Sequence, residues 1–104
     1  MRRAAKVDAN HASVVAALRA IGCMVQDLSG VGDGCPDLLV GIRGTPRGKI
    51  LVLMEIKDGD KAPSKQRLTK DQLQFYAQWD GFPVDTVRSV EQAVAIVNAY
   101  RVCG

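Results

Sequence analysis

Apolar residues recur along this chain with two different periods, one helical and one strand-like. Four apolar residues near the start share the helical spacing: Val14, Val15, Leu18 and Ile21. This spacing predicts a helix over about 8–21, which ends at Gly22. Short apolar runs bounded by glycine, proline and aspartate predict strands. The predicted strands are about 23–28, 37–43, 50–57 and 83–88.

The first turn of a second helix is marked by a polar signature after a breaker-rich loop. Thr69 and Gln72 have the spacing of a capping box, in which each side chain bonds the other residue's backbone N–H. Leu73, Tyr76 and Ala77 form the apolar stripe of this helix, which ends at the next glycine.

The last helix is predicted from the same two signals. Ser89 and Gln92 repeat the capping-box spacing. An apolar stripe follows at helical spacing: Val90, Ala93, Val94, Val97 and Tyr100. The predicted order of elements is therefore αβββαβα.

The two middle strands are apolar at nearly every position, and the turn "GTPRGK" joins them as a hairpin. Strands of this kind are typical of sheets covered on both faces. The expected fold class is α/β, with a central mixed four-stranded sheet flanked by helices.

Composition places the chain among ordinary globular domains. Its 104 residues fit a single domain over 1–104, of which 47% are hydrophobic and 24% charged. No apolar run reaches the roughly 20 residues of a membrane span, and no signal peptide is expected. Three scattered cysteines, Cys23, Cys35 and Cys103, fit core filling in a reducing cytoplasm rather than disulfides or a zinc site.

Positive charge gathers in two clusters, although the net charge is only +3. One cluster surrounds the hairpin turn: Arg43, Arg47 and Lys49. The other follows the second middle strand: Lys57, Lys61, Lys65, Arg67 and Lys70. Each lysine alone fits a solvated surface, but two clusters flanking the same acids favour a polyanionic partner such as nucleic acid.

Charged residues also stand at the ends of the most apolar strands. Asp37 opens one strand, and Glu55 and Lys57 close the other on the same face. A tight hairpin brings these ends together, and two adjacent carboxylates repel unless a divalent cation lies between them. An all-oxygen site with few protein ligands suits Mg²⁺, which activates water and neutralises a phosphoryl group. Lys57 would then orient or deprotonate the attacking water, or bind the phosphate.

A simpler reading of these residues is an ion pair at the sheet edge, between Lys57 and either acid. The full string favours catalysis, because "PD" and "EIK" stand at matching ends of two buried strands.

The motif Pro36-Asp37 with Glu55-Ile56-Lys57 resembles the signature of the PD-(D/E)XK nuclease superfamily, which has the restriction-endonuclease-like fold. Within it the chain is most similar to the small standalone VRR-NUC proteins often carried by phages. The likeness extends over nearly the whole chain. It also rests on "DAN", "GVGDGCPDLLVG", "EIKDG" and "LTKDQ".

The resemblance implies a nuclease dependent on Mg²⁺ or Mn²⁺. It assigns Asp37, Glu55 and the backbone carbonyl of Ile56 as metal ligands, and Lys57 as the catalytic lysine. It also places Gln72 in the active site, whereas the capping box gives Gln72 a purely structural role.

One departure concerns the first helix, where the family commonly has a glutamate and this chain has Ser13. Asn10 or Asp8 could substitute, but helix capping is the expected job of either. His11 is expected to be a surface residue.

The resemblance further implies a homodimer that cleaves branched DNA such as Holliday junctions, in the cytoplasm of a bacterial or phage-infected cell. Three alternatives stay open: a less selective repair nuclease or nickase, a DNA-binding module weakened by Ser13, and a structural protein with a salt-bridged sheet end. Phe75, Tyr76 and Trp79 make the second long helix a candidate dimer face, with core packing as the other explanation.

Overall fold

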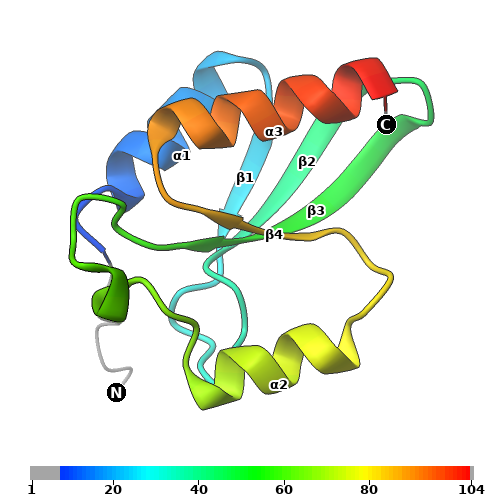
Figure 1. The fold of residues 1–104 in the computed structure, drawn as a ribbon. Helices are drawn as coiled ribbons and strands as arrows, with labels where there is room; N and C mark the ends of the chain where they lie inside the picture. Colours follow the sequence, from blue (N-terminus) through cyan, green and yellow to red (C-terminus); the bar gives the residue numbers. More distant parts are fainter. Residues whose placement is uncertain (1–7, 104) are drawn as a thin grey trace.

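The computed structural model describes residues 8–103 and has the predicted order of elements (Figure 1). The helices are α1 (His11–Ala20), α2 (Lys70–Gln78) and α3 (Val90–Cys103). The strands are β1 (Met24–Asp27), β2 (Leu38–Thr45), β3 (Gly48–Ile56) and β4 (Val84–Val87). A short 3₁₀ turn, η1 (Pro63–Lys65), interrupts the segment expected to be an irregular loop.

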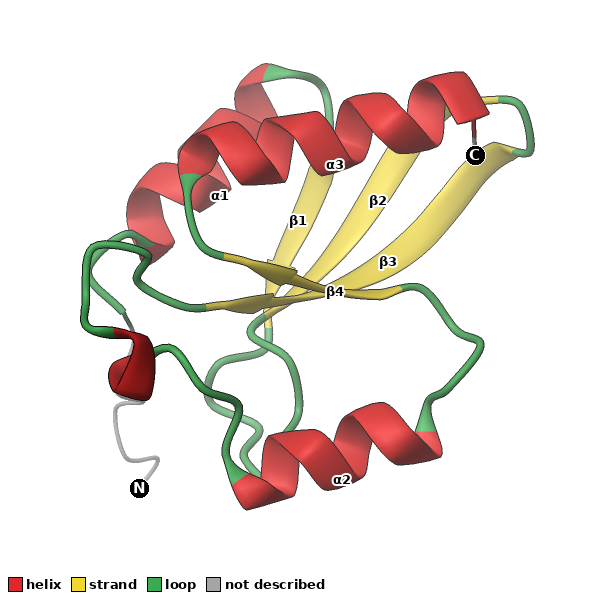
Figure 2. Ribbon diagram, in the orientation of Figure 1, coloured by secondary structure: helices red, strands yellow, loops and turns green. Residues whose placement is uncertain are grey.

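The four strands form one mixed sheet in the order β1-β2-β3-β4 (Figure 2), which confirms the predicted α/β class and sheet. β1 and β2, like β2 and β3, run antiparallel, whereas β3 and β4 run parallel. The parallel pair needs a crossover connection, and the segment containing α2 supplies it.

The predicted hairpin is confirmed, with a shorter turn than expected. Thr45 pairs with Gly48, so both strands continue into the "GTPRGK" segment. The Thr45 hydroxyl donates to the Gly48 carbonyl at 2.6 Å and accepts from the Arg47 N–H at 3.2 Å. These two bonds close the turn around Pro46 and Arg47.

The hydrophobic core lies between the sheet and the two helices α1 and α3, which cover the same face (Figure 1). Alternate residues of the strands point into it, as the pleat requires. Its fully buried side chains include Val14, Leu18, Leu38, Val40, Met54, Ile56, Val87 and Val97.

The opposite face is only partly covered, so the expectation of cover on both faces was wrong. α2 lies on this side (Figure 1) but spans only part of the sheet. Leu51 remains 65% exposed on β3. The stripe predicted for α2 was wrong for two of its three residues: Leu73 is 57% exposed and Ala77 is exposed. Tyr76 faces the sheet as predicted, together with Gln72. The apolar sequence predicted full cover of this face, but within residues 8–103 α2 covers only part of it.

The two capping boxes had different outcomes. Thr69 and Gln72 form both bonds of the box at the start of α2. At the start of α3 the Gln92 N–H donates to the Ser89 hydroxyl at 3.0 Å, as predicted. The Gln92 side chain, however, accepts from the N–H of Arg88 at 2.6 Å rather than from that of Ser89.

The cysteines are all free, but only Cys23 is buried in the core. Cys35 is half-buried and Cys103 is exposed, so core filling was the wrong expectation for Cys103. Within residues 8–103, no helix is long and apolar enough to cross a bilayer.

Candidate active site

The β2–β3 hairpin brings the two predicted acids together. Leu38 pairs with Met54, so the preceding residue, Asp37, lies beside Glu55. The Asp37 carboxylate accepts the backbone N–H of Ile56 at 2.8 Å, which fixes it against the end of β3. The prediction that Asp37 and Glu55 meet in space is therefore confirmed.

The two carboxyl groups form a pair in which Glu55 is buried and Asp37 is half-buried. Glu55 is only 3% exposed. Burial, the hydrogen bond to Asp37 and the negative charge of Asp37 raise the pKa of Glu55 to about 9, and the positive charge of Lys57 only partly opposes this. Glu55 therefore holds a proton more readily than an ordinary carboxyl group. Its Oε1 atom is buried without a hydrogen-bond partner.

Lys57 is buried at the end of the same strand, on the face of Glu55. Its Nζ donates to Oε1 of Gln72 at 2.8 Å. The same Oε1 accepts the Thr69 N–H at 2.9 Å, and the Gln72 N–H donates to the Thr69 hydroxyl at 3.2 Å. Gln72 therefore caps α2 and also contacts Lys57, although the sequence presented these two positions as alternatives.

Tyr76 and Thr86 complete the attachment of α2 to the sheet. The sequence assigned Tyr76 only to the apolar stripe or a dimer face, and it assigned Thr86 no role at the site. Their hydroxyls are hydrogen-bonded at 2.7 Å, and Thr86 pairs with Glu55 in the β3–β4 register. Burial raises the pKa of Tyr76, and the charge of Glu55 raises it further, so the phenol stays neutral near the carboxyl pair. Tyr76 follows Gln72 by one helical turn, and that spacing was the available signal.

The glycine-rich loop before β2 touches the start of α2. Gly34 has φ +78°, a left-handed conformation that favours glycine. A Cβ atom on Gly34 would lie 2.2 Å from the carbonyl oxygen of Asp71. Only glycine allows this approach, which brings the loop leading to Asp37 against the helix that carries Gln72.

The first helix contributes an amide instead of a carboxylate. Nδ2 of Asn10 donates to the Lys57 carbonyl at 3.2 Å and lies 3.4 Å from the Arg88 carbonyl. Asn10 occupies the N-cap position of α1, but its side chain makes no capping bond, so the expected capping role was wrong. Its Oδ1 is buried without a partner. Asn10 therefore ties together the ends of β3 and β4.

The other residues near the start of α1 differ in position. Ser13 is exposed and provides no acid. The charge of Asp8 adds to the rise in the pKa of Glu55, so Asp8 lies within electrostatic range of the site. Asp8 caps nothing with its side chain and pairs with Lys61 at 3.6 Å.

His11 is not the surface residue that was expected. It is 7% exposed, and its Nε2 lies 3.3 Å from the Asp27 carboxylate, which links α1 to the end of β1. The pKa of Asp27 is lowered, chiefly by the hydrogen bonds that Ser29 donates to it. This contact is separate from the carboxyl pair and reads as structural.

The two basic clusters lie at opposite ends of the hairpin, so the expectation that both flank the acids was wrong. Lys49 and Glu55 are six residues apart on one strand, which separates them by about 20 Å. The cluster at the turn is exposed: Arg43, Arg47 and Lys49. The segment between β3 and α2 carries the other: Lys61, Lys65, Arg67 and Lys70. Only this second cluster adjoins the site.

The oxygen ligands at this site suit a hard divalent cation, although the site includes few acidic side chains. Residues 8–103 contain no group of three or more His, Cys, Asp or Glu side chains placed to hold a metal. Mg²⁺ commonly uses one or two carboxylates and keeps several waters. Asp37 and Glu55 supply that number, and the unpartnered Oε1 of Glu55 is an oxygen that a cation would satisfy.

No protein-family model, curated protein or solved structure matches this chain.

Proposed function

We propose that this protein is a metal-dependent endonuclease of the PD-(D/E)XK type, which hydrolyses phosphodiester bonds in branched DNA as a homodimer. One observation carries the proposal: a buried carboxyl group, a half-buried carboxyl group hydrogen-bonded to it and a buried lysine meet at the ends of two neighbouring strands. Burying ionisable groups costs stability, and groups of this kind gather at functional sites.

The side chains divide the work of the proposed reaction. Asp37, Glu55 and the carbonyl of Ile56 would hold Mg²⁺ or Mn²⁺, which lowers the pKa of a bound water and neutralises charge on the phosphoryl group. The charge of Lys57 lowers the pKa of Glu55, so its ammonium group lies within electrostatic range of the carboxyl pair. Gln72 holds that ammonium group by a single acceptor, which leaves donors for a phosphate oxygen or the attacking water.

Substrate binding would follow the basic segment between β3 and α2. Lys61, Lys65, Arg67 and Lys70 offer phosphate contacts next to the site, and such contacts position a nucleic acid without reading its bases. A domain of this size favours recognition of DNA shape. A two-fold dimer would present two sites to strands of opposite polarity, as symmetric cleavage of a four-way junction requires.

The test uses labelled four-way junction, linear duplex and flap substrates with Mg²⁺, Mn²⁺ or EDTA. We expect paired symmetric nicks on the junction, no cleavage in EDTA, and loss of at least about 1,000-fold in rate for Asp37→Asn. Asp60→Asn changes an exposed acid in the nearby loop and is the matched control. Equal cleavage by Asp37→Asn and wild type would refute the proposal.

A second candidate is a DNA-binding module without turnover, and the exposed Ser13 in place of an acid favours it. It predicts DNA retention with no cleavage in Mn²⁺ and no effect of Asp37→Asn on binding. Unpaired nicks on linear duplex would instead identify a less selective nuclease or nickase.

A further inference from the structure

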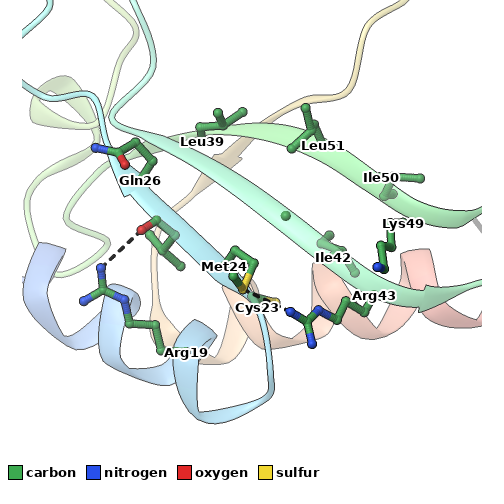
Figure 3. Close-up of a pocket in the computed structure, with 12 residues that line it drawn as sticks. Arg19, Cys23, Met24, Gln26, Leu39, Ile42, Arg43, Lys49, Ile50 and Leu51 are labelled. Carbon is green, nitrogen blue, oxygen red and sulfur yellow. Dashed lines mark hydrogen bonds between the residues drawn. The ribbon is translucent and has the colours of Figure 1, made fainter.

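The sheet face that α2 leaves open contains a hollow of about 700 Å³ over β1, β2 and β3 (Figure 3). Its apolar floor includes Met24, Leu39 and Leu51, of which Met24 is 58% and Leu51 65% exposed. Gly41 lies between Met24 and Leu51, and a Cβ atom there would lie 3.3 Å from Cβ of Met24. The absence of a side chain at Gly41 therefore deepens the hollow. Exposed apolar side chains gathered in one hollow make it a candidate site of interaction.

The rim of the hollow is positively charged. Arg19, Arg43 and Lys49 contribute to its lining, which contains no aspartate or glutamate. The guanidinium of Arg43 reaches over the floor and lies 3.6 Å from the sulfur of Met24 (Figure 3). A complementary occupant must therefore combine apolar side chains with negative charge.

The chain itself presents such a segment at the end of α2. We call residues 79–82, Trp79, Asp80, Gly81 and Phe82, the aromatic lip. Trp79 is 41% and Phe82 64% exposed, and their rings meet edge to face at 5.4 Å. Asp80 stands exposed between them and forms no ion pair within residues 8–103.

The aromatic lip directly follows α2, and α2 lies on the same side of the sheet as the hollow (Figure 1). The N–H of Leu53 donates to the carbonyl of Pro83 at 2.9 Å, which holds the residue after the lip against β3. Leu53 and Leu51 share one face of that strand. The lip nevertheless contributes nothing to the lining of its own hollow. A protrusion and a depression side by side on one surface allow two copies to exchange them about a two-fold axis.

We propose that the hollow receives the aromatic lip of a second copy of this chain. Trp79 and Phe82 of one copy cover Met24, Leu39 and Leu51 of the other, and Asp80 meets Arg43 and Lys49. Trp79 is 41% and Phe82 64% exposed, so only part of each ring is left to cover. An aromatic side chain buries about 150–250 Å² in full, so the four lip aromatics of a dimer add about 300–500 Å². With a similar area of the floor they cover, the total is about 600–1,000 Å², which is the size of a weak, transient interface.

This inference names the surfaces of the homodimer that the proposed function requires, but it does not rest on hydrolysis. Self-association is measured without DNA or metal, so the dimer and the nuclease activity can fail separately.

The decisive experiment is a charge reversal followed by sedimentation equilibrium of the full chain. The lip variant Asp80→Lys and the rim variant Arg43→Glu/Lys49→Glu each place like charges at both contacts of a homodimer. Each alone is expected to associate at least about 30-fold more weakly than wild type. An equal mixture restores both contacts in a heterodimer, so dimers should return on mixing. Recovery on mixing also shows that both variants fold.

A second measurement tests the apolar part of the interface. Trp79→Ser/Phe82→Ser is expected to weaken association at least about 30-fold. Val102→Ala, at the exposed end of α3 across the sheet, should leave it unchanged. A wild-type chain that stays monomeric at millimolar concentration, or variants that dimerise as wild type does, would overturn the inference. The hollow would then belong to a different partner.

Discussion

The two ends of the β2–β3 hairpin both carry charged side chains, but in different surroundings. At one end Glu55 and Lys57 are buried and Asp37 is half-buried. Asp37 is bonded to the backbone and Lys57 to Gln72. At the other, Arg47 and Lys49 stand in solvent. In a low-dielectric site each charge alters the ionisation of its neighbours, as the pKa of Glu55 shows. Exposed charges are screened and act as a diffuse field. The buried charges are therefore suited to catalysis, and the exposed charges are suited to attracting a polyanionic partner.

Lys57→Met gives the largest expected effect at the buried end. The change removes the ammonium group but keeps an apolar stem of similar length, so we expect the cleavage rate to fall about 1,000-fold. Stability should stay equal or rise, because an uncharged side chain avoids the cost of burial. Single-turnover cleavage and urea unfolding measure the two effects. Lys65→Met is the exposed control; a loss of fold in Lys57→Met would contradict the prediction.

Gly34→Ala tests the support beneath the buried end. The new Cβ atom would collide with the Asp71 carbonyl, and alanine is strained at φ +78°. We expect a loss of about 2–3 kcal/mol of unfolding free energy, measured by urea titration. Gly44→Ala is the matched control, because its φ is +75° and its Cβ would meet nothing within 4 Å. Equal losses in the two variants would mean that strain, not contact with α2, is the cause.

The pH dependence of stability tests the carboxyl pair. Because the folded-state pKa of Glu55 is raised to about 9, its contribution is fully present below the unfolded value near 4.5. That contribution is lost as the pH rises towards 9. In EDTA we expect the wild type to lose on the order of 2 kcal/mol between pH 5 and 9.

Glu55→Gln keeps a neutral group in place and should remove most of that pH dependence. Glu91→Gln, at an exposed position, should leave the dependence as in wild type. Parallel stability curves for Glu55→Gln and wild type would show that Glu55 does not hold the proton. Added Mg²⁺ should stabilise the wild type most at high pH. There the carboxyl pair carries fewer protons, so fewer protons must be released when the metal binds.

The smallest effect is expected at the exposed end. Arg47→Ala should change DNA affinity by less than about twofold, because one exposed charge far from the site contributes little. Arg67→Ala, beside the site, should weaken binding several-fold and reduce the slope of log K against log salt by about one. Fluorescence anisotropy across a salt series distinguishes them. Equal slopes would place the DNA along both ends of the hairpin.

Sequence reasoning succeeded where local rules determine the outcome. Alternation along a strand put Glu55 and Lys57 on one face, and a short hairpin fixed Asp37 beside them. Capping-box spacing located the start of α2 through Thr69 and Gln72. The order of elements and the mixed sheet followed from these signals together.

The errors arose where the outcome depends on what a residue meets across the fold. His11 contacts Asp27 at the end of β1, where the fold buries it. No spacing in the sequence relates these two residues. Leu51 and Leu73 are apolar yet exposed. An apolar residue in the sequence predicts burial, but it does not show which part of the fold would cover it. Asn10 binds backbone carbonyls 47 and 78 residues away, contacts that only the folded chain reveals.

One oxygen of Gln72 accepts both the Lys57 ammonium group and the Thr69 amide. Fraying of the first turn of α2 therefore releases the lysine in the same event. The exchange rate of the Thr69 amide proton should then report how often the lysine loses its anchor, in the resting protein and without any substrate.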